Sequence, residues 1–182
     1  MSARDALTEL DADLQRVFGA RLRSLVTYGA PRHDSLTQTL VVVEGLTGDD
    51  LHACATRVAA WHTANLATPL LLEAQELPRS LDAFPIEFSA ILASYVVVSG
   101  TDPFVGCRLD LRQLRTACEL QARSHLLHLR EDYLETEGRA SALAELILES
   151  APALAALVTN IARLEGAGAA GPEAAGQHVE RV

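Results

Sequence analysis

The spacing of apolar residues divides the chain into two kinds of region. As far as about residue 100, short β-rich runs alternate with stretches of helical period, beginning with an amphipathic helix marked by Leu7, Leu10 and Leu14. The β-rich runs predict four strands, over residues 22–29, 37–45, 68–77 and 94–100. The resulting order α-β-β-α-β-α-β predicts a small mixed sheet in an α/β unit spanning residues 1–106.

The second region is helical. From Asp110 to about Glu137, apolar residues repeat at three- and four-residue intervals, which predicts one long helix. After the sequence EGR the pattern restarts at Ser141 and reaches Leu164, with a kink or break expected near Pro152. Two such helices predict an antiparallel helical hairpin over residues 107–166. The Gly- and Ala-rich residues 167–182 predict a disordered tail.

Composition excludes several function classes. The 182 residues carry a net charge of −9, and all fifteen basic residues are scattered arginines, so nucleic acid is a poor partner. The absence of lysine excludes a phosphate-loop lysine and Schiff-base chemistry. No uninterrupted apolar run has the length of a membrane span, and the first residues lack the layout of a secretion signal. We therefore expect a cytoplasmic protein that does not act at a membrane.

The cysteines and histidines do not form a metal-binding pattern. Cys54, Cys107 and Cys118 are widely spaced, which predicts free thiols and neither a disulfide framework nor a zinc site. His125 and His128 share a helical face, but no third ligand accompanies them. We expect them to be ordinary surface and half-buried side chains.

The stretch LVTYGAPRHDSLTQTLVVVEG, residues 25–45, has the most suggestive pattern. The first strand ends at Gly29, which is followed by Ala30 and a short polar turn. Thr37 and Thr39 stand at positions i and i+2 where the second strand begins. Residues with this spacing project from the same face of a strand. The two hydroxyl groups are therefore expected beside the turn, on one face of the sheet.

This arrangement resembles the nucleotidyltransferase fold of the polymerase-β type. In that family the first strand runs into a Gly-Ser pair, the second bears Asp-x-Asp before an apolar run, and a later strand supplies a third acid. Here Gly29 matches, Ala30 replaces the serine, and Thr37 and Thr39 occupy the two carboxylate positions. The likeness covers about residues 5–100. With the long helices included, the chain also looks like a bacterial group of nucleotidyltransferase-domain proteins of unknown role.

The two threonines change the chemistry that the resemblance implies. Nucleotidyl transfer depends on divalent ions that stabilise the attacking and leaving oxygens, and Mg²⁺ prefers anionic oxygen ligands. Thr37 and Thr39 supply no charge, so we expect a catalytically degraded protein with no metal cofactor. It would serve as an interaction module or as a binding module for a nucleotide or small phosphorylated ligand. The residues expected at that site are Gly29, Ala30, Thr37, Thr39 and Glu73.

Two alternatives stay open. An active, magnesium-dependent transferase would need other acids, such as Glu73 on the third strand, Asp34 in the turn beside His33, or an acid from another subunit. Glu73 is equally well interpreted as a solvated strand residue. Arg123 and His128 show the Arg-x4-His spacing of a helical RNase family that is often encoded beside minimal nucleotidyltransferases, as in toxin–antitoxin systems. A solvated helix face is the more ordinary explanation of that spacing.

The predicted hairpin has more apolar surface than two helices can cover in each other. The sequence LAELILESAPALAALV is apolar almost throughout, and the preceding helix has a long apolar seam of its own. Packing on the sheet or on a second subunit is therefore expected. A homodimer through the C-terminal helices would bury this surface.

Overall fold

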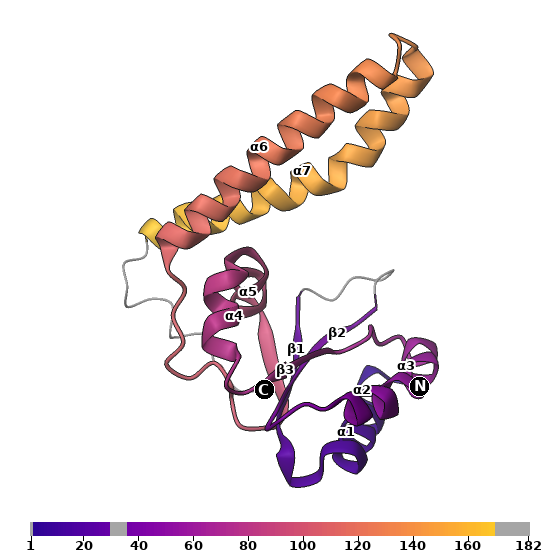
Figure 1. Ribbon diagram of the computed structural model, residues 1–182, viewed down its shortest axis with the longest axis vertical. Helices are drawn as coiled ribbons and strands as arrows, with labels where there is room; N and C mark the ends of the chain where they lie inside the picture. The colour runs from indigo at the N-terminus through magenta and orange to yellow at the C-terminus, as the bar shows by residue number, and fades with distance from the viewer. Residues whose placement is uncertain (1, 30–35, 170–182) are drawn as a thin grey trace. The chain divides into compact units, whose positions relative to one another are not determined.

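The computed structural model describes residues 2–29 and 36–169, and the chain divides into two compact units, Met1–Arg108 and Leu109–Val182 (Figure 1). We call the first the N-terminal unit, and we call the two helices of the second, with the turn between them, the hairpin. The predicted class is confirmed: a small mixed sheet in an α/β unit is followed by an antiparallel helical hairpin. Helix α7 extends to Ala169, so residues 167–169 of the predicted disordered tail are helical. The other residues of that tail lie outside the described range.

The N-terminal unit is built on a four-stranded sheet. The strands are β1 (Leu22–Tyr28), β2 (Gln38–Val43), β3 (Leu70–Glu73) and β4 (Tyr95–Gly100). Their order across the sheet is β3-β2-β1-β4; β1 is antiparallel to both of its neighbours, and β2 runs parallel to β3. The parallel pair requires a crossover, which the helices between β2 and β3 supply.

Helices cover both faces of this sheet (Figure 1). The helical elements of the unit are α1 (Ala3–Phe18), a 3₁₀ turn (Gly19–Arg21), α2 (Gly48–Ala55), α3 (Val58–Thr63), α4 (Leu77–Ala83) and α5 (Pro85–Ala93). Thr47 caps α2, and its hydroxyl group accepts a hydrogen bond from the backbone N–H of Asp50. The single helix predicted between the third and fourth strands is divided into α4 and α5, and Pro85 stands in the first turn of α5, where its missing N–H is not needed.

Successive residues of the central strands point into two different cores. Leu25, Val41 and Val43 pack with α1 and with Trp61 of α3 in one buried cluster. Val26 and Leu40 have the opposite parity and are equally buried, on the face that α4 and α5 cover. This explains why β2 is apolar at every position after Thr39, since a strand covered on both faces has no solvent side.

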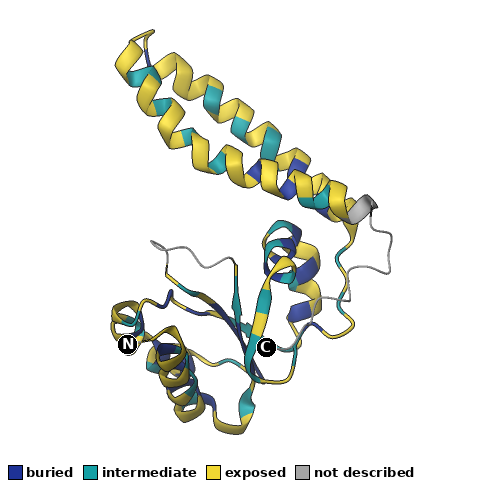
Figure 2. Ribbon diagram, turned by 180° about the vertical axis from the view of Figure 1, so that it is seen from behind, coloured by how far each residue is buried: buried dark blue, intermediate teal, exposed yellow. Residues whose placement is uncertain are grey.

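The hairpin consists of α6 (Leu111–Glu135) and α7 (Ala140–Ala169). A break at Pro152 was one of the predicted outcomes, but α7 is continuous through it. Proline removes one backbone hydrogen bond and frees the carbonyl of Leu148, four residues earlier. Both Pro152 and Leu148 are exposed, so water can solvate that carbonyl and the helix persists. Most hairpin residues are exposed (Figure 2).

One helix among the described residues is long and apolar enough to cross a membrane, by length and composition alone. It spans Ala140–Gly166, with a mean hydropathy of 1.6 in its most apolar window. Only 6% of that window is buried in the structure. The same composition is expected of a helix with two apolar sides, one packed on α6 and one exposed to solvent in the single chain.

Candidate functional site

The predicted site lies where β1 ends and β2 begins. Gly29 closes β1 with a φ of 80°, a left-handed conformation that favours glycine, and its N–H donates to the carbonyl of Ser94 at 2.9 Å. Directly across the antiparallel pair, Thr27 of β1 faces Thr39 of β2. Thr37 prolongs β2 by one bridge to Leu66. The structure therefore brings Gly29 and both threonines to one end of the sheet.

Three threonine hydroxyls form a row on one face at this end. Thr37 and Thr39 have the parity of Val41, so they project from the face that packs against α1. Thr27, half-buried, stands opposite Thr39 on the same face. Thr39 is only 1% exposed, and its Oγ1 has no hydrogen-bond partner among the described residues. A buried hydroxyl without a partner costs about 1–3 kcal/mol, so Thr39 is a good candidate to bond a ligand or water.

Glu73 is not at this end of the sheet. In the parallel pairing of β2 with β3, Glu73 lies beside Val43. Val43 is four residues beyond Thr39, about 13 Å along an extended strand. The Glu73 carboxylate accepts hydrogen bonds from the backbone N–H of Leu46 at 2.6 Å and from Gln75. These two bonds lower the pKa of Glu73 and tie the side chain to the turn after β2.

The acid expected from a later strand has no counterpart beside the threonines. The chain that runs next to Thr37 and Thr39 toward β3 is Leu66-Ala67-Thr68-Pro69, which contains no carboxylate. Within the ranges 2–29 and 36–169, no group of three histidine, cysteine, aspartate or glutamate side chains is placed to hold a metal ion. Ala30, His33 and Asp34 lie outside the described residues.

The buried carboxylates of this unit instead serve the fold. Asp13 on α1 accepts hydrogen bonds from Arg16 at 2.6 Å, from Arg57 at 2.8 Å and from the indole N–H of Trp61 at 2.9 Å. Burial acts to raise the pKa of Asp13, but the hydrogen bonds from Arg57 and Trp61 outweigh it, and the pKa is lowered. This ion was missed in the sequence, although Asp13 falls in the apolar phase of its helix, between Leu10 and Leu14.

A second structural carboxylate joins α2 to the turn before β1. Both oxygens of Asp50 accept from the guanidinium group of Arg21, at 2.7 and 2.9 Å, and Thr47 donates to the same carboxylate. The contacts from Arg21 and Thr47 hold the pKa of Asp50 well below its usual range. Because its oxygens are already paired, Asp50 is poorly suited to hold a metal ion.

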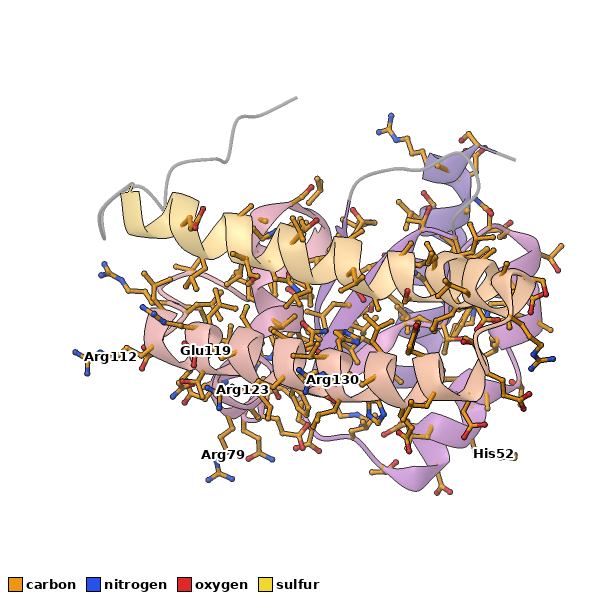
Figure 3. All side chains as sticks on the ribbon, turned by 90° about the horizontal axis from the view of Figure 1, so that it is seen from above. His52, Arg79, Arg112, Glu119, Arg123 and Arg130 are labelled. Carbon is orange, nitrogen blue, oxygen red and sulfur yellow. The ribbon has the colours of Figure 1, made fainter. Side chains whose placement is uncertain are left out.

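The structure does not bring Arg123 and His128 together within one hairpin. Five residues along a helix correspond to a rotation of about 140°, so the two side chains leave α6 in different directions. Arg123 projects outward from α6 (Figure 3). His128 is exposed, with Nδ1 at 3.5 Å from the carboxylate of Glu131. The neighbouring His125 is half-buried, and its Nε2 has no partner among the described residues.

The three cysteines are free, as predicted. Cys54 and Cys118 are buried, and burial raises the pKa of both thiols. A raised pKa keeps a thiol protonated and unreactive. Burial also raises the pKa of the half-buried Cys107 thiol, so none of the three is a candidate nucleophile.

No protein-family model and no curated protein matches this sequence. A spectinomycin adenyltransferase from Enterococcus faecialis, solved with ATP and spectinomycin, is similar with a TM-score of 0.47 and 10% identity, over 88% of this chain and 98% of that chain. A chain from a complex of a tri-AMPylated Shewanella oneidensis HEPN toxin with an MNT antitoxin is similar with a TM-score of 0.40 and 12% identity, over 69% of this chain and 95% of that chain. Similarity this low does not extend to function.

Proposed function

We propose that this chain is a catalytically inactive nucleotidyltransferase-like module, which binds a nucleotide or small phosphorylated ligand beside Gly29 without transferring it. One observation supports this above the others. The two strand positions that hold carboxylates in the resembled family are Thr37 and Thr39, and Glu73, the acid on the neighbouring strand, lies at the other end of the sheet. The described part of the site therefore has hydroxyl groups, and no carboxylate, at the positions that the resemblance assigns to metal ligands.

The missing charge matters because of how nucleotides are transferred. Two divalent ions neutralise the phosphoryl group in the transition state, and the protein supplies the anionic oxygens that hold them. A neutral hydroxyl group is a much weaker ligand for a hard dication than a carboxylate is, because it carries no charge. They can still donate hydrogen bonds to a phosphate or ribose, and the Oγ1 of Thr39 has no competing protein partner among the described residues.

The first test is a pair of assays on the full chain with ATP. Isothermal titration calorimetry with and without Mg²⁺ measures binding, and incubation with α-³²P-labelled ATP measures transfer to the protein or to added acceptors. We expect no labelled product, and any binding should persist when Mg²⁺ is removed. Magnesium-dependent transfer would overturn the proposal. It would then favour the active alternative, in which Asp34 or an acid from another subunit supplies the charge.

The second test restores the charge. The double variant Thr37→Asp/Thr39→Asp places two carboxylates at the family's spacing, and Thr37→Asn/Thr39→Asn is the control of equal size without charge. Burying a carboxylate at the Thr39 position should lower the melting temperature, because Thr39 is almost fully enclosed. A metal that binds the folded state should restore stability. We expect Mn²⁺ to raise the melting temperature of the aspartate variant alone.

Each outcome of the second test has a clear meaning. A response of the aspartate variant that the asparagine variant and the wild type lack would support the proposal that threonine has replaced metal ligands here. If Mn²⁺ leaves the aspartate variant unchanged while circular dichroism shows it folded, Thr37 and Thr39 do not occupy the metal positions. If the wild type itself responds to Mn²⁺, other residues hold a metal.

A further inference from the structure

The two helices of the hairpin pack along one seam only. On α7 the residues of the seam recur at alternating intervals of three and four, the period of helices that pack side by side. They are Leu143, Leu146, Ser150, Ala153, Leu157, Asn160 and Leu164. Leu157 and Asn160 are buried in it, as are Leu114 and Cys118 on α6. This seam accounts for one side of each helix.

A second apolar stripe follows α7 beside the seam and is open to solvent. Ile147, Leu154, Val158 and Ile161 also recur at helical spacing, turned from the seam by about 40–100°. Ile147 is 59% exposed and Val158 is 64% exposed. A hairpin in water that lacked a partner would have no reason to keep a continuous stripe of large aliphatic side chains.

The open stripe continues onto α6. These parts of the two helices share one side, because a shallow depression is lined by residues of both: Arg115, Cys118, Glu119, Ala122, Ile161, Leu164 and Glu165. Leu126 and Tyr133 extend the α6 stripe from Ala122 at four- and seven-residue steps, and both are exposed. We call this surface, formed by Ala122, Leu126, Tyr133, Ile147, Leu154, Val158 and Ile161, the outer face.

Charge is distributed unevenly along the hairpin. The base, residues 109–123 and 154–169, has four arginines against three acidic residues, a net charge of +1. The tip, residues 124–153, has two arginines against six acidic residues, a net charge of −4. The acidic residues of the tip are Glu131, Asp132, Glu135, Glu137, Glu145 and Glu149. A partner that covers the outer face must therefore accept a strongly acidic tip.

We propose that the partner is a second copy of this chain, paired through the outer face with the two hairpins antiparallel. A two-fold axis across the middle of the hairpin places the acidic tip of each copy on the basic base of the other. The parallel arrangement would set two tips of charge −4 side by side, and like charges across an interface are strongly disfavoured. Two hairpins packed in this way form a four-helix bundle, and a two-fold pairing is the commonest symmetry of soluble oligomers.

The same charges make a membrane a poor occupant of the outer face. A bilayer-spanning α7 would have to bury Glu145 and Glu149, both near its N-terminal end. Carboxylates inside a bilayer are rare and costly unless they have partners. If α7 instead lay flat on an anionic bilayer, that surface would repel the acidic tip. A second copy in the antiparallel arrangement covers the apolar stripe and places the acidic tip beside the basic base.

The interface is tested by one substitution inside the outer face and one beside it. Val158→Glu introduces a charge into the stripe, whereas Thr159→Glu adds the same charge about 100° around the helix. Light scattering coupled to gel filtration, over a dilution series of the full chain, gives the dimer dissociation constant. We expect a wild-type dimer, a loss of affinity of at least roughly tenfold for Val158→Glu, and little change for Thr159→Glu. Circular dichroism verifies that both variants remain folded.

The orientation is tested by a distance between tips. A nitroxide is attached at Ser141→Cys in a Cys107→Ser background, since Cys54 and Cys118 are buried. Helix α6 has 25 residues and is about 37 Å long, so antiparallel hairpins hold their tips roughly 30 Å or more apart. Double electron–electron resonance between the nitroxides of the two copies should show that separation. A short tip-to-tip distance would refute the antiparallel arrangement.

Three results would overturn the proposal of a second copy. They are a wild-type monomer at all concentrations measured, a dimer that Val158→Glu leaves intact, and co-sedimentation of the full chain with neutral phosphatidylcholine vesicles that Val158→Glu abolishes. The last would assign the outer face to a lipid surface. None of these results bears on the ATP-binding proposal, which concerns the N-terminal unit.

Discussion

The two units of this chain bury their apolar side chains to different extents. Nineteen of the apolar side chains that are buried in the structure belong to the N-terminal unit and three to the hairpin. The distribution of large exposed apolar side chains is the reverse, with six in the N-terminal unit and eleven in the hairpin (Figure 2). A sheet with helices on both faces encloses its own core, whereas two helices can enclose only one seam.

The ion pairs of the two units also differ. In the N-terminal unit, Asp13 and Asp50 bind arginines from distant parts of the chain, so each ion pair joins separate elements. In the hairpin, the half-buried Gln121 and His125 each keep a buried side-chain atom without a partner in the described structure. Thr39 and Ser89 of the N-terminal unit have such atoms as well, so the difference lies in the ion pairs: those of the described hairpin join only residues three or four positions apart.

The largest expected effect is the loss of stability when a leucine is shortened to alanine, which should be large in the N-terminal core and small on the hairpin surface. Leu10→Ala removes a side chain that is 0% exposed, and it should lower the free energy of unfolding by about 2–5 kcal/mol. Leu127→Ala, at a position 63% exposed, should change it by less than about 0.5 kcal/mol. Urea unfolding, followed by fluorescence of the single tryptophan, Trp61, reports on the N-terminal unit, while far-UV circular dichroism also reports on the long helices. Comparable losses for the two variants would contradict the comparison.

The next effect in size concerns the hairpin alone. Pro152→Ala restores a backbone hydrogen bond in the middle of α7, and alanine is favoured over proline inside a helix by about 3 kcal/mol. We expect the circular dichroism transition to move to higher urea concentration by an amount within that limit. The transition of Trp61 fluorescence should stay in place. A shift of both transitions would show that the two units unfold together.

The sequence predicted the kinds of elements better than their limits. All four strands were confirmed because each is a short β-rich run, and both long helices were confirmed because their apolar period is regular. The single helix predicted between the second and third strands is divided into α2 and α3 at Thr56 and Arg57, where Arg57 forms an ion pair with Asp13 on α1. A contact 44 residues away along the chain leaves no local signal, so the division could not be predicted.

The candidate site was predictable only as far as it is local. The spacing of Gly29, Thr37 and Thr39 along two adjacent strands was sufficient to place them together, because a short connection makes the strands an antiparallel pair. The position of Glu73 depends on the register of β3 against β2, which no local pattern specifies. The partnerless hydroxyl of Thr39 likewise depends on which helices cover the sheet.

A smaller effect appears as a dependence on pH. The pKa of Asp50 lies below its ordinary value of 3.8 in the folded chain, because Arg21 and Thr47 donate to its carboxylate. A lowered pKa in the folded state adds stability above the unfolded pKa, and that stability is lost as the pH falls from 3.8 toward the folded value. Asp50→Asn should therefore be less stable than the wild type near neutral pH, with a difference that shrinks in acid.

The control for this pH dependence lies in the hairpin. Glu119→Gln removes an exposed ion pair with Arg115, of a kind that contributes about 0–1 kcal/mol at most. Urea unfolding at several pH values compares each variant with the wild type, by Trp61 fluorescence for Asp50→Asn and by far-UV circular dichroism for Glu119→Gln. A difference between Asp50→Asn and the wild type that stayed constant down to the most acidic pH would show that the carboxylate charge is not the cause.

The smallest expected effect concerns Glu73, and it tests which end of the sheet binds a ligand. Glu73→Gln keeps an acceptor oxygen for the N–H of Leu46 and removes only the charge. Because Glu73 lies beside Val43, away from Thr39, we expect the affinity for ATP to stay within about twofold of the wild type, a free-energy change of less than about 0.5 kcal/mol. Thr39→Val, which keeps the shape of the side chain and removes the partnerless hydroxyl, is the matched variant, and it should weaken binding more. If calorimetry found the reverse order, the ligand would sit near Glu73, and the interpretation of the threonine row as the binding end of the sheet would be wrong.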